Sequence, residues 1–198
     1  MRIVLASKSP RRRELLEQMG IKKFEIVCSE ADETVAPGLA PDEVVKTLSR
    51  RKAAAVAERV EPEDLIIAAD TVVALDDLIL GKPADAEAAK EMLHRLSGRT
   101  NEVYTGITVL RDGRSVTECE RTAVRFRELS EKEICDYVAT GEPMDKAGAY
   151  GIQGLGAMLI SGIEGDYFNV MGLPVFRLNQ ILTGFGLDLL AEAAGETR

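Results

Sequence analysis

The chain has 198 residues, of which 45% are hydrophobic, enough for one sizeable core or a domain with two lobes, and we expect a single domain over residues 1–198. Its formal net charge of -8 opposes binding to nucleic acid or anionic membranes, and no apolar run approaches the length of a membrane span. The three cysteines form no Cys-x-x-Cys pair, so neither a disulfide framework nor a zinc site is indicated, and a cytoplasmic location is favoured.

The first residues predict a strand followed at once by a helix. The apolar run from Arg2 to Ala6 is typical of a short strand and ends in small polar residues. Ser9 is expected to cap the helix, with Pro10 at its first position and Gly20 at its end. The turn between strand and helix therefore lies at the carboxyl end of the strand.

The first turn of this helix contains three arginines: Arg11, Arg12 and Arg13. The helix dipole disfavours each cation there by about 0.3–1 kcal/mol, so their presence needs an explanation. Free backbone N–H groups and guanidinium groups together attract anions, and Lys8 extends the basic cluster in an otherwise acidic chain. We interpret the cluster as a phosphate site. The alternative is a solvent-exposed basic turn balanced by Glu14 and Glu17.

A long helix with an unexpected lysine follows. Residues 24–27 predict a strand, and the loop after it contains Glu33. From about Asp42 to Val60 the apolar residues repeat at the helical period, and Lys52 falls near the middle of their face. Either the lysine extends its ammonium to water from a core position, or the face borders a cleft and the ammonium meets an anion.

The run Leu65 to Ala69 is continuously apolar and stops at the carboxylate of Asp70. It predicts a strand that is covered on both faces and that ends at Asp70, where ligands of open α/β sheets collect. A hairpin with its turn at residues 76–77 would pair Thr71 with Lys82 and bring the lysine to the same strand end. The alternative is a surface hairpin with a stray charge pair.

The second half of the chain predicts further helices, strands and a glycine-rich loop. A helix is expected over 84–97, capped by Asp85, and two strands, 103–110 and 116–126, are expected on either side of an Asp112-Gly113 turn. The Ser130/Glu133 capping box begins a further helix that extends to about 140, and the glycine-rich loop spans 145–156. A closing hairpin of 158–163 and 167–170 and a last helix over 174–183 complete the prediction. The only histidine, His94, is expected at the surface, which excludes histidine-based triads and polyhistidine metal sites.

Basic residues at element ends and two carboxylates form one predicted constellation. The basic members are Lys8, Arg11, Arg12, Arg13, Lys52, Lys82 and Lys146, and the carboxylates are Glu33 and Asp70. Cations neutralise phosphate oxygens, while carboxylates hold Mg²⁺ or Mn²⁺ or orient a water molecule. This mixture suits a nucleoside triphosphate bound with a divalent metal.

The sequence resembles the Maf family of nucleotide pyrophosphatases over nearly its whole length. The resemblance is carried by LASKSPRRRELL (5–16), ADET (31–34), AADTVV (68–73), GKP (81–83), LSGRTNEVYTG (96–106) and DKAGAYGIQGLGA (145–157). It implies an α/β fold of the Maf and ITPase type, with a mixed twisted sheet, flanking helices and a central cleft. It also implies a homodimer that cleaves noncanonical or pyrimidine nucleoside triphosphates to monophosphate and pyrophosphate, a housecleaning reaction.

The resemblance also assigns roles to residues. It implies that Asp70 accepts a proton from the attacking water and that Glu33, Lys52 and Lys82 line the site. We expect these three to be further catalytic residues, and from the chemistry of the carboxylates we expect Glu33 and Asp70 to hold the divalent metal. The residues expected to bind substrate are Ser7, Arg11, Arg12, Arg13, Thr71, Lys146 and Gln153. Among these, the combination of Arg12, Thr71 and Gln153 is the one expected in the branch that prefers dTTP and UTP.

The chemistry of Gln153 is consistent with that branch. Its amide offers one acceptor and one donor, which match N3–H and O4 of uracil or thymine. An adenine edge or a flipped amide would pair as well, so the match is not exclusive. The resemblance also implies two alternatives: a pyrophosphatase acting on 7-methyl-GTP, and a nucleotide-binding regulator of septum formation that acts as an interaction protein. No residue pattern favours the second beyond the resemblance itself.

Overall fold

The computed structural model describes residues 2–195, so Met1 and residues 196–198 of the predicted domain lie outside the described residues. The chain divides into two compact units. Unit 1 consists of Met1–Asp70, Thr105–Glu120 and Gly172–Arg198, and unit 2 of Thr71–Tyr104 and Arg121–Met171. A single domain over the whole chain stays a prediction.

A mixed sheet of seven strands is the framework of the fold. Its hydrogen-bonded order is β2-β1-β3-β5-β6-β7, and β4 pairs with β3. The strands are β1 (Ile3–Leu5), β2 (Glu25–Ile26), β3 (Leu65–Leu75), β4 (Leu78–Leu80), β5 (Thr100–Arg111), β6 (Arg114–Phe126) and β7 (Ile160–Glu164). The β1 ladders to β2 and β3 are parallel, whereas β4 and β7 pair antiparallel. The predicted α/β fold with a mixed sheet and flanking helices is confirmed, and the central cleft stays a prediction.

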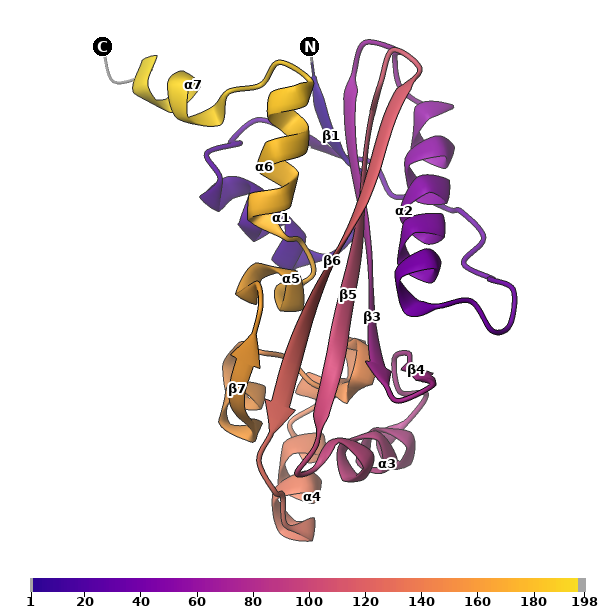
Figure 1. Cartoon of the computed structure of the whole chain (residues 1–198), viewed down its shortest axis with the longest axis vertical. Helices are drawn as coiled ribbons and strands as arrows, with labels where there is room; N and C mark the ends of the chain where they lie inside the picture. The colour runs from indigo at the N-terminus through magenta and orange to yellow at the C-terminus, as the bar shows by residue number, and fades with distance from the viewer. Residues whose placement is uncertain (1, 196–198) are drawn as a thin grey trace. The chain divides into compact units, whose positions relative to one another are not determined.

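Unit 1 packs helices on its strands. In Figure 1, α1 (Pro10–Gln18) and α6 (Val175–Gly184) lie on one side of β1, and α2 (Pro41–Ala57) lies on the other. The apolar face of α2 covers β1 and β3, and the core side chains there are at most 1% exposed: Val4, Ala53, Val56 and Ile66. The helix and its buried face match the predicted pattern, although α2 ends at Ala57 rather than near Val60.

A glycine in β5 allows α2 to approach the sheet. A Cβ atom added to Gly106 would lie 2.4 Å from the Val45 carbonyl oxygen of α2, far inside van der Waals contact. Only a residue without a side chain therefore fits at this position while the two backbones keep their separation.

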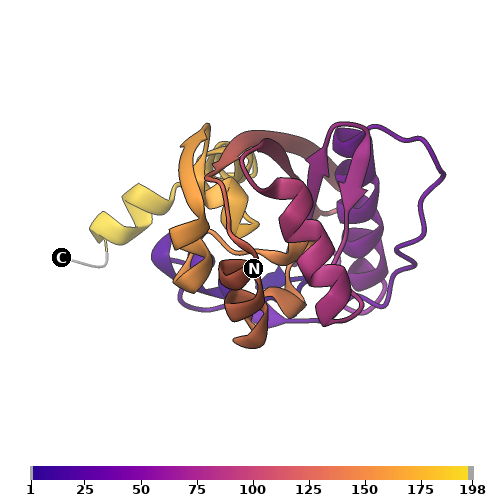
Figure 2. The same ribbon diagram turned by 90° about the horizontal axis from the view of Figure 1, so that it is seen from below.

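Unit 2 has its own core beneath two helices. Here α3 (Ala86–Leu96) and α4 (Glu131–Ala139) pack against each other, as Figure 2 shows in magenta and brown. Their buried residues include Leu93 and Ile134. Phe126 of β6 meets the Tyr150 ring edge to face, with ring centroids 4.8 Å apart. Three one- or two-turn 3₁₀ helices, at Glu142–Asp145, Ala147–Ala149 and Gly154–Leu159, shape the glycine-rich loop.

Several local predictions are confirmed. The Asp85 carboxylate accepts from the Ala88 N–H, and Ser130 and Glu133 form the full capping box. Asp112 has a φ of 50° in the tight turn between β5 and β6. The hairpin of β3 and β4 has the predicted register, with Val73 opposite Leu80, but its ladder ends there and does not reach Lys82.

The predicted strand end at Asp70 is wrong, because β3 continues to Leu75. The parallel ladder to β1 stops at Ile67, and the antiparallel ladder to β4 begins at Val73. New neighbours therefore keep the backbone extended past the carboxylate. Asp70 lies inside the strand, at the point where β1 has ended.

The predicted closing hairpin is also wrong. Residues 160–164 form β7 on β6, but α5 (Tyr167–Met171) is a helix. The Asp166 carboxylate accepts from the Phe168 N–H, and the buried Asn169 amide donates to Thr122 Oγ1 and the Val103 carbonyl. These side-chain bonds favour a helical turn over a second strand. In addition, α6 is not the last helix, because α7 (Leu189–Gly195) follows it.

We expect Gly106→Ala to destabilise the protein, because the new methyl group forces α2 away from β5. Overpacking of this kind costs about 1–3 kcal/mol. Urea unfolding followed by circular dichroism measures the change. Gly184→Ala on α6 is the matched control, since a Cβ atom added there would lie 3.8 Å from Nη2 of the flexible Arg114 side chain, an ordinary van der Waals contact. Equal stability of the two variants would contradict the close approach.

Candidate functional site

Lys52 of α2 lies between two carboxylates of unit 1. Its Nζ is 2.5 Å from Asp70 Oδ1 on β3 and 2.9 Å from Glu33 Oε1 in the loop before α2. The side chains of Lys52 and Asp70 are 14% and 12% exposed, whereas that of Glu33 is 67% exposed. Of the two interpretations of Lys52, the structure supports an ammonium that meets anions, and the chain itself supplies them.

The positions of these groups follow from the secondary structure. Lys52 occurs one turn after Leu48 and one turn before Val56, so it belongs to the face of α2 that covers β3. Asp70 is 9% exposed and continues the buried sequence of that strand. A carboxylate and an ammonium that face each other across a packed helix and strand offset each other's charge.

Arg51, the neighbour of Lys52, holds the loop that carries Glu33. Its Nη1 donates to the carbonyls of Asp32, at 3.2 Å, and Thr34, at 2.5 Å, one on each side of Glu33. The Thr34 N–H in turn donates to the Asp32 carboxylate. Sequence reasoning missed Arg51, because nothing in a helical pattern distinguishes a surface arginine that binds a loop from one that faces water.

Arg12 is directed inward and binds the backbone. Its Nε donates to the Gly172 carbonyl at 2.7 Å, and its Nη1 donates to the Ala69 carbonyl at 2.8 Å and to Ser7 Oγ at 3.2 Å. Burial lowers the pKa of Arg12, while the nearby charge of Asp70 acts in the opposite direction. Arg12 thus connects the turn after β1 to the residue that precedes Asp70.

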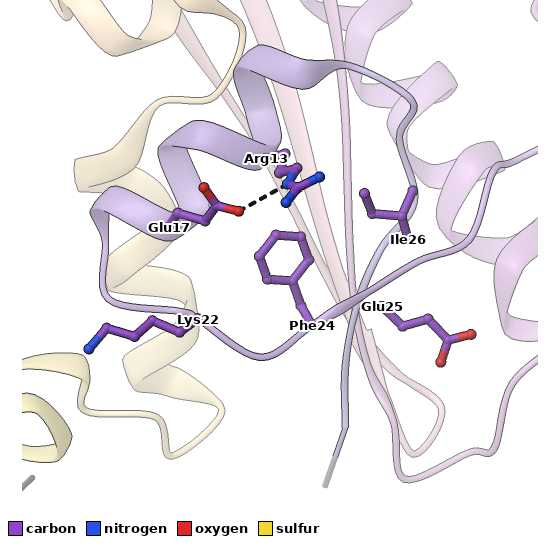
Figure 3. Close-up of a pocket in the computed structure, with 6 residues that line it drawn as sticks. All are labelled: Arg13, Glu17, Lys22, Phe24, Glu25 and Ile26. Carbon is purple, nitrogen blue, oxygen red and sulfur yellow. Dashed lines mark hydrogen bonds and ion pairs between the residues drawn. The ribbon is translucent and has the colours of Figure 1, made fainter.

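Arg13 is directed outward. Its Nε pairs with Glu17 Oε1 at 2.9 Å, and the arginine side chain is 58% exposed. Figure 3 shows this pair at the rim of an open hollow that Phe24 and Lys22 also line. For Arg13 the structure therefore matches the balanced basic turn. Arg12 and Arg13 point in different directions, and the positive charge of Arg11 acts on Arg12.

The remaining predicted site residues belong to unit 2. They are Thr71, Lys82, Lys146 and Gln153, of which Thr71 and Lys146 are half-buried and the other two exposed. Lys146 Nζ donates to the Glu142 carbonyl at 2.5 Å and to Asp145 Oδ1 at 2.7 Å. The Glu142 carboxylate binds the backbone of the same loop, a role that no sequence pattern predicted. Roles for these residues in a reaction stay predictions.

Glu33 and Asp70 are the two carboxylates that are expected to hold a divalent metal. Within residues 2–195, no group of three or more His, Cys, Asp or Glu side chains is arranged to hold a metal ion. Glu33 and Asp70 do converge on one positive charge, the Lys52 ammonium. Mg²⁺ commonly uses one or two carboxylates and completes its shell with water and substrate phosphates. The donor set therefore fits such an ion.

The chain is similar to known proteins in both sequence and structure. The "dTTP/UTP pyrophosphatase" of Bacillus cereus (strain AH820) is 49% identical over 188 residues, which are 95% of this chain and 97% of that protein. The protein of the same name from Bacillus anthracis matches at the same identity and coverage. A solved structure, "Structure of a HAM1 protein from Coxiella burnetii", superimposes with a TM-score of 0.52 at 15% identity, over 93% of this chain and 99% of that one.

The structural likeness supports the fold alone, because the identity is low. The sequence profile described as Maf-like protein, however, matches residues 2–185, and therefore spans nearly the whole chain. Together with the two Bacillus proteins, this match settles the relationship. The chain belongs to the Maf-like protein family.

Proposed function

We propose that this protein hydrolyses nucleoside triphosphates, with dTTP and UTP as preferred substrates, to the monophosphate and pyrophosphate. The observation that carries the proposal is the 49% identity, over 95% of this chain, to a relative named dTTP/UTP pyrophosphatase. The carboxylate, ammonium and carboxylate of Asp70, Lys52 and Glu33 supply chemistry that such a reaction needs.

Water attacks the α-phosphorus in the proposed reaction. A bond forms between the water oxygen and that phosphorus, and the bond from phosphorus to the oxygen that bridges the α- and β-phosphates breaks. Pyrophosphate leaves with the electron pair, and Asp70 accepts the proton of the water. The Lys52 ammonium fixes Asp70 Oδ1, which restricts the orientation of the carboxylate.

We assign most of the positively charged site residues to binding the phosphates of the substrate. Lys82, Lys146 and Arg11 would neutralise phosphate oxygens, and Ser7 would donate a hydrogen bond. Arg13 would join them only by leaving its exposed ion pair with Glu17. Arg12 is better suited to positioning, since its guanidinium is engaged by two carbonyls and Ser7 Oγ. Its bond to the Ala69 carbonyl restrains the backbone next to Asp70.

Glu33 and Asp70 are the proposed ligands of a divalent cation, Mg²⁺ or Mn²⁺. When bound, such an ion would offset the negative charge that develops on the phosphate oxygens. The Lys52 ammonium lies between these two carboxylates. Its positive charge limits the repulsion between them.

We also propose a cytoplasmic homodimer that acts on free nucleotides rather than on nucleic acid or membranes. The net charge of -8 supports this choice of substrate, since polyanions are repelled. Among the described helices, none is long and apolar enough to cross a membrane. Light scattering during gel filtration would measure the oligomeric state.

We expect Asp70→Asn to reduce turnover of dTTP by about 10²–10⁴-fold, as for the loss of a general base. Malachite-green detection after pyrophosphatase treatment measures the rate, and circular dichroism checks folding. Asp42→Asn is the matched control, because Asp42 is a half-buried carboxylate of the same α2 helix that also pairs with a lysine, Lys46. Turnover by Asp70→Asn within a few-fold of the wild type would rule out the assignment.

Activity is expected to require a divalent cation, because the substrate has about four negative charges and metal ions usually stabilise the developing charge. Excess EDTA should abolish pyrophosphate release, and added Mg²⁺ or Mn²⁺ should restore it. Protein passed through a desalting column after EDTA treatment controls for damage by the chelator. Full activity in EDTA would contradict the metal proposal and leave the substrate proposal standing.

The preference for UTP and dTTP over purine triphosphates and 7-methyl-GTP is expected to depend on Gln153. An unsatisfied buried polar group costs about 1–3 kcal/mol, or roughly ten- to a hundred-fold in kcat/KM. Gln153→Leu should therefore reduce the ratio of kcat/KM for UTP to that for 7-methyl-GTP more than it slows the poorer substrate. Gln180→Leu, at an exposed position of α6, is the control.

A wild-type protein that prefers 7-methyl-GTP would contradict the substrate preference and support the alternative branch. A purified protein that releases pyrophosphate from none of the common or modified triphosphates would contradict the enzymatic proposal. That outcome would favour the alternative of an interaction protein.

A further inference from the structure

Glu142 lies at the start of the glycine-rich loop of unit 2, and its carboxylate binds that loop. Its Oε1 accepts from the Gly156 N–H at 2.9 Å and from the Tyr137 hydroxyl at 3.0 Å. Its Oε2 accepts from the Leu155 N–H at 3.0 Å. Both carboxylate oxygens are therefore engaged, and two of the three donors are backbone groups just after Gln153.

The segment before Gln153 is held by the partner of Glu142. The Gly151 N–H donates to the Tyr137 hydroxyl at 3.3 Å, so this hydroxyl accepts from Gly151 and donates to Glu142. Tyr137 belongs to α4 and is 5% exposed within the core of unit 2. Gln153 thus lies between two anchored points, although its own side chain is exposed.

Glycines make the close approach of these groups possible. A Cβ atom at Gly156 would lie 2.3 Å from the Gly151 carbonyl oxygen and 2.7 Å from the Tyr137 hydroxyl. At Gly154, whose φ is 67°, it would lie 2.8 Å from Glu142 Oε2. The loop backbone therefore fits around the carboxylate only with glycine at these positions.

Glu142 also restrains Lys146, through its backbone. Its carbonyl accepts from Lys146 Nζ at 2.5 Å, and the lysine side chain is 15% exposed. A Cβ at Gly151 would lie 2.9 Å from Lys146 Cε, so the lysine stem packs directly on the loop backbone. One glutamate therefore binds both the expected phosphate-binding lysine and the backbone just after the expected base-reading glutamine.

The carboxylate is ionised at neutral pH. Burial acts to raise the pKa of Glu142, but the hydrogen bonds from the Gly156 and Leu155 N–H groups and the Tyr137 hydroxyl, together with the charge of Lys146, lower the pKa below its ordinary value. An ionised carboxylate is an acceptor only, which suits the three donors directed at it. A glutamine at this position would direct its NH₂ group, itself a donor, at one of these three donors.

From these contacts we infer that Glu142 is a positioning residue for base selection: it fixes the 151–156 segment so that Gln153 presents its amide in one place. This inference rests on the proposed function. A loop held at both sides of Gln153 limits the size and hydrogen-bonding edge of the base that fits. A released loop would accept larger bases such as 7-methylguanine.

Glu142→Ala is expected to lower the ratio of kcat/KM for UTP to that for 7-methyl-GTP by about tenfold, mainly through a higher KM for UTP. Glu142→Gln should give a smaller loss, because one acceptor oxygen remains. In the double variant with Gln153→Leu, the ratio should not fall further than in Gln153→Leu alone, since both changes remove the same discrimination. Asp136→Asn, an exposed partner of Lys132 on α4, is the matched control.

Amide hydrogen exchange tests the same inference without turnover. The amides of residues 151–156 should exchange faster in Glu142→Ala than in the wild type, and those of α2 should not. If thermal unfolding shows that Glu142→Ala does not fold, Glu142→Gln is used for both measurements. Equal losses for both nucleotides, multiplicative effects in the double variant, or unchanged exchange would each overturn the inference. A wild type that does not hydrolyse UTP would overturn the proposed function, while the exchange result would still decide the role of Glu142.

Discussion

The buried carboxylate of Asp70 is the constraint on which the arrangement of unit 1 depends. An unpaired ionised group at this depth costs several kcal/mol, so a positive charge must reach it from a neighbouring element. The Lys52 ammonium of α2 does so at 2.5 Å, and it reaches Glu33 as well. The close packing of α2 on the sheet, which Gly106 permits, is what allows a lysine in an apolar face to meet this carboxylate. Under the proposed function, the contact that stabilises the buried charge would also orient the carboxylate that accepts the proton.

The basic residues near the N-terminus illustrate how such a site is supported. Arg12 donates to carbonyl groups at positions 69 and 172, so it restrains both the strand that carries Asp70 and the chain before α6. Arg13, the next residue, pairs with Glu17 at the surface. One arginine triplet therefore contains a positioning group and an exposed ion pair. Exposed ion pairs contribute little to stability, about 0–1 kcal/mol, whereas a guanidinium among backbone acceptors fixes the geometry around it.

In unit 2 a negatively charged side chain, that of Glu142, fixes the backbone. Glu142 binds backbone N–H groups of the glycine-rich loop, as Arg12 binds the Ala69 and Gly172 carbonyls in unit 1. In both cases a charged side chain holds the backbone rather than a ligand. The glycine residues of this loop have two effects. They permit the loop backbone to approach Glu142 and Tyr137 closely, and they make the backbone so free to rotate that it needs an anchor. Arg51 has the matching role beside Glu33. In each case a charged side chain binds backbone groups close in the chain to a residue that is expected to meet substrate.

The sequence by itself determined the features that depend on neighbours in the chain. The capping box at Ser130, the tight turn at Asp112 and the apolar face of α2 with its unexpected lysine each involve residues within a few positions of one another. Only the tertiary structure decided that β3 continues past Asp70, that residues 167–171 are helical, and that Arg12 turns inward. The physical reason is the range of the contacts: Arg12 binds a carbonyl 160 residues away, and no local pattern encodes which distant group a long side chain will meet.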